Sequence, residues 1–365
     1  MTQQNRNGKL PVLLWLLFLA GCGPVVERAE TESASNVPLN VTVMTFNVQN
    51  LFDNVDDPGK DDKAYLPIDA KQNAAHINAC NEIAVASWRD ECLNLDWSVA
   101  ALDHKLTVLA DTIRQVDSGR GADIIALQEV ENVAILERLR TEYLAELGYG
   151  PAILIEGSDV RGIDVAFLSR LPLAGPAILH PLRLSDFPDR EGDTRGVLQA
   201  DFVLPSGSIL TGFSVHFPAP FHPTPMRVAA YALLNTLLAA LPDARAAFAG
   251  GDFNTTTTED GEKNLLDNYA RPYWALAHDV GCLMCQGTHY YAREDSWSFL
   301  DMLLFSGGRG ENTTARIRAD SVRIANLNPA QVSVNGTPER YHAAERTGVS
   351  DHWPMIATIE LAQKQ

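Results

Sequence analysis

The sequence has 365 residues, of which 46% are hydrophobic, so the chain is long and apolar enough to form a globular core in one large domain or two. Its formal net charge of −17 excludes binding through a broad basic face. A phosphate-bearing substrate would therefore require local cations or a metal ion.

The N-terminus has the pattern of a secretory signal. Arg6 and Lys9 precede an apolar run over residues 10–20, which is too short to span a bilayer comfortably. The tetrapeptide "LAGC" resembles the bacterial lipobox, in which Cys22 would be lipidated and become the mature N-terminus. An ordinary signal peptide cleaved nearby is the alternative. We expect a lipoprotein signal peptide over residues 1–21.

The next segment, residues 22–38, is rich in Ser, Thr and Glu and has no periodicity, as is typical of a tether between a lipid and a domain. Gly23 stands where an Asp is associated with inner-membrane retention in enteric bacteria. We therefore expect a protein outside the cytoplasm, anchored by lipid to the outer membrane and facing either the periplasm or the cell surface.

Strand-like segments rich in β-branched and aromatic residues follow, at 41–48, 122–130, 163–169, 197–204, 208–217, 246–253, 300–306 and 355–361. Helical patterns lie between some of them, at 102–116, at 136–147 before Gly148, and at about 226–241. Strands at hairpin distance alternate with strands separated by helices. This order predicts an α/β fold with mixed sheets and helices packed outside them, in one domain over residues 39–362.

Residues 53–97 show little periodicity. Their first ten, "DNVDDPGKDD", are dense in carboxylates and could bind calcium, but they lack the spacing of an EF-hand loop. A solvated acidic loop is the better interpretation.

Five cysteines minus Cys22 leave four, an even number for an oxidising compartment. Two disulfides are expected, and pairing Cys80 with Cys92 and Cys282 with Cys285 closes the shortest loops. The Cys-x-x-Cys pair could instead be redox-active or bind zinc, but zinc requires four ligands and the sequence has no second such pair.

Polar side chains end or interrupt the apolar strands. These residues are Asn47, Glu129, His216, Asp252, Asn254, Asp301, Asp351 and His352. Strand ends on one edge of a sheet converge in space, so acids, amides and imidazoles at these positions indicate a metal or catalytic site.

The motifs "TFNVQNL", "DIIALQEVEN", "VHFPAP", "GGDFN", "WSFLDMLLFS" and "SDHWP" together resemble those of the endonuclease/exonuclease/phosphatase superfamily, in the family's order. The resemblance covers about Val41 to Glu360. It implies the fold of deoxyribonuclease I, a four-layer α/β/β/α sandwich with two mixed β-sheets face to face and helices on both outer sides.

The same resemblance implies a divalent metal site. It assigns Glu129 as the principal metal ligand, with Asn47 and Asp351 beside it. Carboxylate and amide oxygens suit Mg²⁺ or Mn²⁺.

Catalytic roles are implied as well. Asp252 and Asn254 would orient and deprotonate the attacking water, and Asp301 would bond to His352 and hold that imidazole against the phosphate. His216 matches a second histidine that contacts phosphate in the deoxyribonuclease-like and sphingomyelinase-like branches.

Two further residues are weaker candidates for the substrate-phosphate site. Asp164 is expected to pair with His216, and Arg195 to clamp a phosphate oxygen, although surface salt bridges would explain either residue equally well.

Together these features predict a divalent-metal-dependent hydrolase of phosphodiester bonds, an extracytoplasmic nuclease. Its partners would be a nucleic acid substrate and, through the lipid anchor, a membrane; no protein partner is implied. The alternatives are a phospholipase or sphingomyelinase, a phosphomonoesterase of the same superfamily, or an inactive binding protein of the cell envelope.

Overall fold

The computed structural model describes residues 39–308 and 315–361. The expected signal peptide, the tether and Cys22 lie outside the described residues. No helix within the described part of the chain is both long and apolar enough to cross a membrane.

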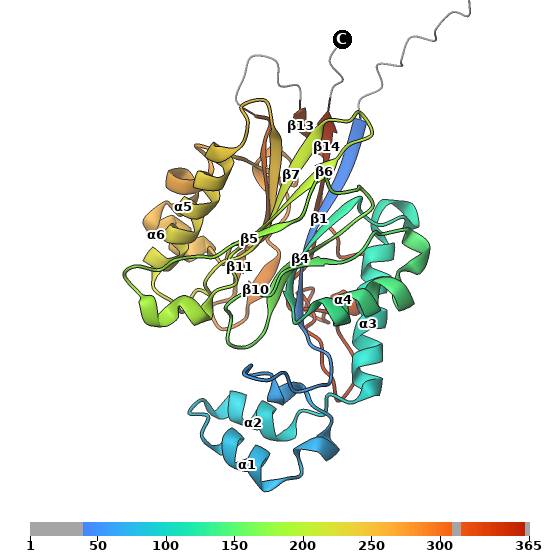
Figure 1. Cartoon of the computed structure of the whole chain (residues 1–365), viewed down its shortest axis with the longest axis vertical. Coiled ribbons are helices and arrows are strands. Elements are labelled where there is room, and N and C mark those ends of the chain that lie inside the picture. Colours follow the sequence, from blue (N-terminus) through green and yellow to red (C-terminus); the bar gives the residue numbers. More distant parts are fainter. Residues whose placement is uncertain (1–38, 309–314, 362–365) are drawn as a thin grey trace, which may run out of the picture. The chain divides into compact units, whose positions relative to one another are not determined.

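Two six-stranded sheets form the centre of the molecule (Figure 1). The first has the order β13 (Ala315–Ile324), β14 (Met355–Leu361), β1 (Leu39–Leu51), β2 (Ile124–Val130), β4 (Asp164–Ser169) and β3 (Ile153–Leu154). The second has the order β5 (Ile178–His180), β6 (Val197–Val203), β7 (Ile209–His216), β8 (Ala246–Asp252), β12 (Asp301–Ser306) and β9 (Ala275–Leu276). Both are mixed, because β1–β2 and β7–β8 are parallel and their other neighbours antiparallel.

The space between the sheets is filled by apolar side chains from both. Phe167 of the first sheet contacts Phe202 of the second, with ring centroids 5.4 Å apart in an edge-on arrangement. Phe248 packs in the same cluster, together with Val43 and Ile124. The central strands are buried on both faces, which is why their sequences are nearly continuous apolar runs.

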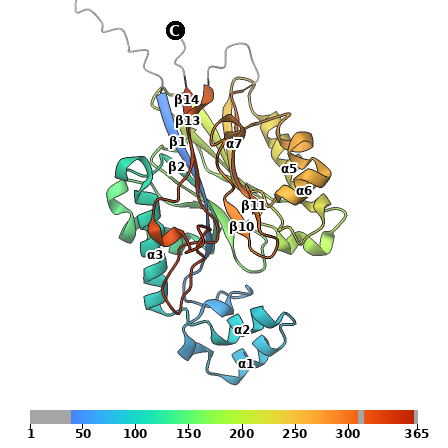
Figure 2. The same ribbon diagram turned by 180° about the vertical axis from the view of Figure 1, so that it is seen from behind.

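Helices cover the outer faces (Figures 1 and 2). On the first sheet, Leu102 and Leu106 of α3 (Val99–Arg114) pack with Phe46, and α4 (Val133–Arg138) joins the same cluster. On the second, Tyr231 of α5 (Thr224–Ala240) packs with Phe213. The short helix α6 (Thr257–Lys263) lies on the same side as α5. Helix α7 (Ala277–Val280) instead contacts β12 of the second sheet and β13 of the first, and its Ala277 belongs to the core between the sheets. The predicted α/β/β/α sandwich is confirmed.

The helix expected over residues 136–147 is shorter than predicted. After α4 the chain continues as a π-helical turn at Leu139–Tyr143 and a 3₁₀ turn at Ala145–Leu147. Gly148 then adopts φ 71° and caps the segment in the left-handed conformation.

The segment expected to be aperiodic contains two helices, α1 (Ala74–Asn81) and α2 (Ala86–Asn94). Each buries one side chain, Cys80 in α1 and Cys92 in α2, and these form a disulfide. A disulfide in place of an apolar stripe joins the two helices, so hydrophobic periodicity could not reveal them. The second expected pair, Cys282 with Cys285, is also formed.

The remaining regular structure is short. A hairpin of β10 (His289–Tyr291) and β11 (Ser296–Ser298) stands apart from both sheets. Further 3₁₀ turns lie at Lys63–Tyr65, Ile68–Lys71, Val116–Gly119, Pro188–Asp193 and Pro329–Gln331.

Gly251 on β8 tests the close packing of the strands beside Asp252. A Cβ atom at this position would overlap the backbone carbonyl oxygen of Val215 on β7. The backbone cannot rotate away as a side chain does. We therefore predict that Gly251→Ala lowers the free energy of unfolding by about 1–3 kcal/mol or more. Urea denaturation would measure the loss.

Gly261 in α6 supplies the matched control, since a Cβ there would meet no atom within 4 Å. Gly261→Ala should leave stability unchanged or raise it by up to about 1 kcal/mol. Equal stabilities of the two variants would contradict the packing described for β7 and β8.

Candidate active site

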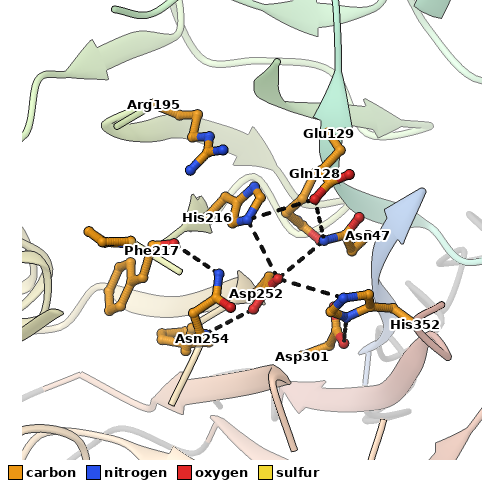
Figure 3. Close-up of polar contacts among 12 residues, drawn as sticks. Asn47, Gln128, Glu129, Arg195, His216, Phe217, Asp252, Asn254, Asp301 and His352 are labelled. Carbon is orange, nitrogen blue, oxygen red and sulfur yellow. Dashed lines mark hydrogen bonds and ion pairs between the residues drawn. The ribbon is translucent and has the colours of Figure 1, made fainter. Parts of the chain in front are cut away.

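Strand register brings the predicted polar residues to one end of the two sheets (Figure 3). In the second sheet, Asp252 at the end of β8 lies opposite His216 on β7 and opposite Asp301 on β12. In the first sheet, Asn47 of β1 pairs with Gln128 of β2, next to Glu129. The site is therefore assembled from five strands, β1, β2, β7, β8 and β12, and from the segment that leads into β14.

Backbone irregularities aim the side chains of the first sheet. The register of β1 with β2 is interrupted after Asn47, and that of β2 with β4 after Gln128. At these breaks Asn50 and Glu129 adopt left-handed conformations, with φ 54° and 65°. The backbone N–H of Asn50 donates to Glu129 Oε2 at 2.9 Å. Such bulges redirect a side chain out of the alternating pattern, and here one presents Glu129 to the site.

The amide of Asn47 joins the two sheets. Its Nδ2 donates to Glu129 Oε1 and to Asp252 Oδ2, each at 3.2 Å. The same Asp252 oxygen lies 3.5 Å from His216 Nε2 and 4.0 Å from His352 Nε2. One carboxylate oxygen thus faces an amide and two imidazoles.

Asp252 is held on its other side by the turn that follows it. Asn254 adopts φ 49°, its backbone N–H donates to Asp252 Oδ1 at 2.9 Å, and its Nδ2 donates to Phe217 O at 2.9 Å. Burial raises the pKa of Asp252 to about 7, the charge of His352 opposes this rise, and the carboxylates of Asp301 and Glu129 add to it. A carboxylate with this pKa can accept a proton near neutral pH.

The two histidines have opposite electrostatic environments. His352 Nδ1 lies 2.7 Å from Asp301 Oδ2. Burial alone would lower the pKa of His352, but the charge and hydrogen bond of Asp301 raise it well above the usual value. Burial lowers the pKa of His216 well below the usual value, and the guanidinium of Arg195 lowers it further. His352 is therefore the charged imidazole and His216 the neutral one.

Arg195 lies beside His216 (Figure 3) and is buried, so it is not a surface residue. Its Nε lies 3.0 Å from Asp159 Oδ2, so the ion pair is internal. Asp164 was expected to pair with His216, and this pair is not formed. Asp164 Oδ1 accepts from the backbone N–H of Gly157 at 2.8 Å, and His216 Nδ1 has no hydrogen-bond partner among the described residues. The backbone of residue 157 provides a donor that the sequence pattern could not indicate.

Asp351 lies at the rim of the site, with its side chain 38% exposed. Its backbone N–H donates to Gln49 Oε1 at 3.1 Å. Its carboxylate and the ring nitrogens of His289 and His352 all lie within 4.8 Å of one another. His289, on β10, reaches the site because its backbone forms an isolated β-bridge with that of His352.

Some residues that shape the site were not predicted. Gln49, inside the "TFNVQNL" motif, accepts the backbone N–H groups of both Tyr341 and Asp351 through Oε1. Lys105 of α3 is fully buried and donates to Val349 O at 2.6 Å, two residues before Asp351. A lysine on the apolar face of that helix was the available signal for this contact. His289 and Asp159 carried no signal of this kind.

The donor set fits a hard divalent cation. Glu129 and Asp252 present carboxylates to the same Asn47 amide, and Asp351 adds a partly exposed carboxylate nearby. Oxygen donors of this kind suit Mg²⁺ or Mn²⁺, and Glu129 with Asn47 would hold the ion.

Residues 91–361 match the Endonuclease/Exonuclease/phosphatase family. No curated protein sequence matches the chain. Among solved structures, an endonuclease/exonuclease/phosphatase family protein from Bacteroides thetaiotaomicron is 15% identical over 89% of this chain and 99% of its own, with a TM-score of 0.55. A humanised TDP2 from D. rerio is 13% identical over 88% and 98%, with a TM-score of 0.52. A mannosyl-6-phosphatase from B. thetaiotaomicron is 15% identical over 87% and 99%, with a TM-score of 0.51.

Proposed function

Because this chain belongs to the endonuclease/exonuclease/phosphatase family, we propose that it is a divalent-metal-dependent phosphodiesterase, and specifically an extracytoplasmic nuclease. The observation that carries the proposal is the environment of Asp252. Its carboxylate lies between a charged and a neutral imidazole and shares an amide donor with Glu129. This arrangement suits hydrolysis of a phosphate ester, in which a proton must leave water while negative charge accumulates on oxygen.

In this proposal Asp252 accepts the proton of the attacking water, whose oxygen bonds to phosphorus as the ester P–O bond breaks. His352, kept protonated by Asp301, donates to a non-bridging phosphate oxygen and stabilises the negative charge. Solvent returns a proton to the leaving alkoxide. A divalent ion bound at Glu129 and Asn47 would neutralise phosphate charge in this acidic protein.

A buried arginine supports a phosphate site on the side of His216. Arg195 is 4% exposed and its charge acts on His216, as does that of Arg161. We propose that Arg195, held by Asp159, faces a phosphate oxygen of the substrate.

Aromatic side chains beside His352 support a nucleic acid substrate. Trp353 lies 5.2 Å from Trp297, and Trp297 lies 5.2 Å from Tyr290, measured between ring centroids. Every nucleobase has a face that can stack on an exposed ring. Trp353 is itself buried, so the partly exposed Trp297 and Tyr290 are the rings that suit a polynucleotide strand.

The proposed location outside the cytoplasm is supported by the N-terminal signal pattern and by the two disulfides, which are stable in oxidising compartments. The lipid anchor at Cys22 belongs to the same proposal.

A substrate panel tests the assignment. Purified protein would be incubated with plasmid DNA, RNA, sphingomyelin vesicles and a phosphomonoester, each with Mg²⁺ and with excess chelator. We expect cleavage of a nucleic acid, loss of that cleavage in chelator, and recovery on adding Mg²⁺ or Mn²⁺, because the acidic site needs a cation to receive phosphate.

The other outcomes of the panel are equally informative. Cleavage of the lipid or the phosphomonoester alone would move the protein to those branches of the family. Activity that is indifferent to the chelator would remove the metal from the mechanism. Failure on all four substrates would favour the inactive binding protein.

The Asp301 and His352 pair generates a pH prediction. Asp301→Asn removes the charge that raises the pKa of His352, so His352 should lose its proton at lower pH. We expect kcat to fall roughly 10²-fold at pH 8 and its alkaline limb to move to lower pH. Steady-state kinetics between pH 5 and 9, on the substrate identified by the panel, would measure both effects.

Asp320→Asn is the control, because this carboxylate on β13 is 78% exposed and pairs with Arg318 at the surface. It should retain the wild-type rate and pH profile. An Asp301→Asn protein that also matched wild type in rate and profile would exclude the pair from catalysis.

A further inference from the structure

Three carboxylates outside the catalytic cluster converge where the loop that follows β1 meets the end of β2. Asp57 and Asp62 belong to this loop, residues 53–62, and Glu131 immediately follows β2. Each offers an oxygen, and these oxygens all lie within 4.8 Å of one another. The expectation of a solvated acidic loop is therefore wrong for part of the segment, because Asp62 is 1% exposed and Glu131 is 3% exposed.

The two buried carboxylates are each fixed through one oxygen only. Asp62 Oδ2 accepts the backbone N–H of Asp57 at 2.8 Å, and Glu131 Oε2 accepts that of Asp53 at 2.6 Å. Asp62 Oδ1 and Glu131 Oε1 are buried and have no hydrogen-bond partner among the described residues. The backbone of the loop thus orients both groups and leaves one oxygen of each unused.

No positively charged side chain compensates this group. Among the described residues, no lysine, arginine or histidine forms an ion pair with Asp57, Asp62 or Glu131. The nearby lysine Lys63 pairs with the exposed Asp61. Burying unpaired carboxylates side by side is costly, and a cation bound between them would offset that cost.

We propose that Asp57, Asp62 and Glu131 bind a structural divalent cation, with Ca²⁺ preferred over Mg²⁺. The donors are all oxygens, and two of them belong to a loop of irregular geometry, which suits the larger and more adaptable coordination sphere of Ca²⁺. Glu131 lies 69 residues after Asp62 in the sequence, so no local spacing rule such as the EF-hand pattern could identify the site.

The bound cation stabilises segments that support the catalytic site. It ties the loop to the chain two residues after Glu129. The same loop contacts the segment that supports Arg195: Lys60 Nζ donates to Asp159 O at 3.1 Å, and Asp159 pairs with Arg195. Fixing the loop therefore restrains both Glu129 and the partner of Arg195.

Calcium titration of the full chain tests the proposal. The protein would carry Glu129→Gln to weaken cation binding at the catalytic site and would be freed of metal with a chelator. Calorimetry should then detect one Ca²⁺ per chain, and Ca²⁺ at about a hundredfold excess over its Kd should raise the Tm by roughly 3–6 °C. Mg²⁺ at the same concentration should raise it less.

Variants locate the ion. In the Glu129→Gln protein, Asp62→Asn should abolish both the heat of binding and the shift in Tm. Asp57→Asn should raise the Kd for Ca²⁺ at least tenfold. Asp57 is half-buried, so its variant keeps the test valid if Asp62→Asn fails to fold. Asp61→Asn, which removes an exposed carboxylate from the same loop, should bind Ca²⁺ unchanged.

Two results would overturn the proposal. One is the absence of Ca²⁺ binding by the Glu129→Gln protein at millimolar concentration, which would mean that protons neutralise the buried carboxylates. The other is binding that survives Asp57→Asn and Asp62→Asn, which would place the ion elsewhere. Neither result depends on which substrate the enzyme cleaves.

Discussion

The side-chain amide of Asn47 is the contact on which the site depends. It comes from β1 of one sheet and donates to Asp252 on β8 of the other, while also donating to Glu129. The bond can form only because the sheets pack face to face with these strand ends at the same edge, and because β1 and β2 leave their regular register there. Core packing between the sheets, as of Phe167 against Phe202, holds the two sheets together.

Neighbouring charges then make chemically similar buried groups behave differently. Two imidazoles and three carboxylates lie close together, yet Asp301 keeps His352 charged, and burial beside Arg195 keeps His216 neutral. Several polar atoms here lack hydrogen-bond partners among the described residues, including Asp301 Oδ1, His216 Nδ1 and Asp164 Oδ2. Such groups reduce stability in the free protein and are available for a ligand, as expected of a preorganised site.

The sequence predicted the parts of the fold and site that follow from local pattern. Apolar runs identified the main strands, and polar residues at their ends, such as Asp252 and His352, proved to lie together. Contacts between distant segments could not be predicted in this way. Asp164 was expected to pair with His216 but accepts from the backbone N–H of Gly157. Glu131 comes close to Asp57 and Asp62 only in the folded chain. Helices α1 and α2 lack an apolar stripe and were missed for that reason.

In the proposed function the shared carboxylate of Asp252 accepts the proton of the attacking water, and Asp252→Asn removes that carboxylate. The amide is isosteric and keeps an oxygen for Asn47, so the circular dichroism spectrum and the fold should be retained. The measurement is kcat on the cleaved phosphodiester with saturating Mg²⁺. We expect kcat to fall about 10³-fold or more, because the group that accepts the proton of water is lost. Turnover within a few-fold of wild type would contradict this role of Asp252.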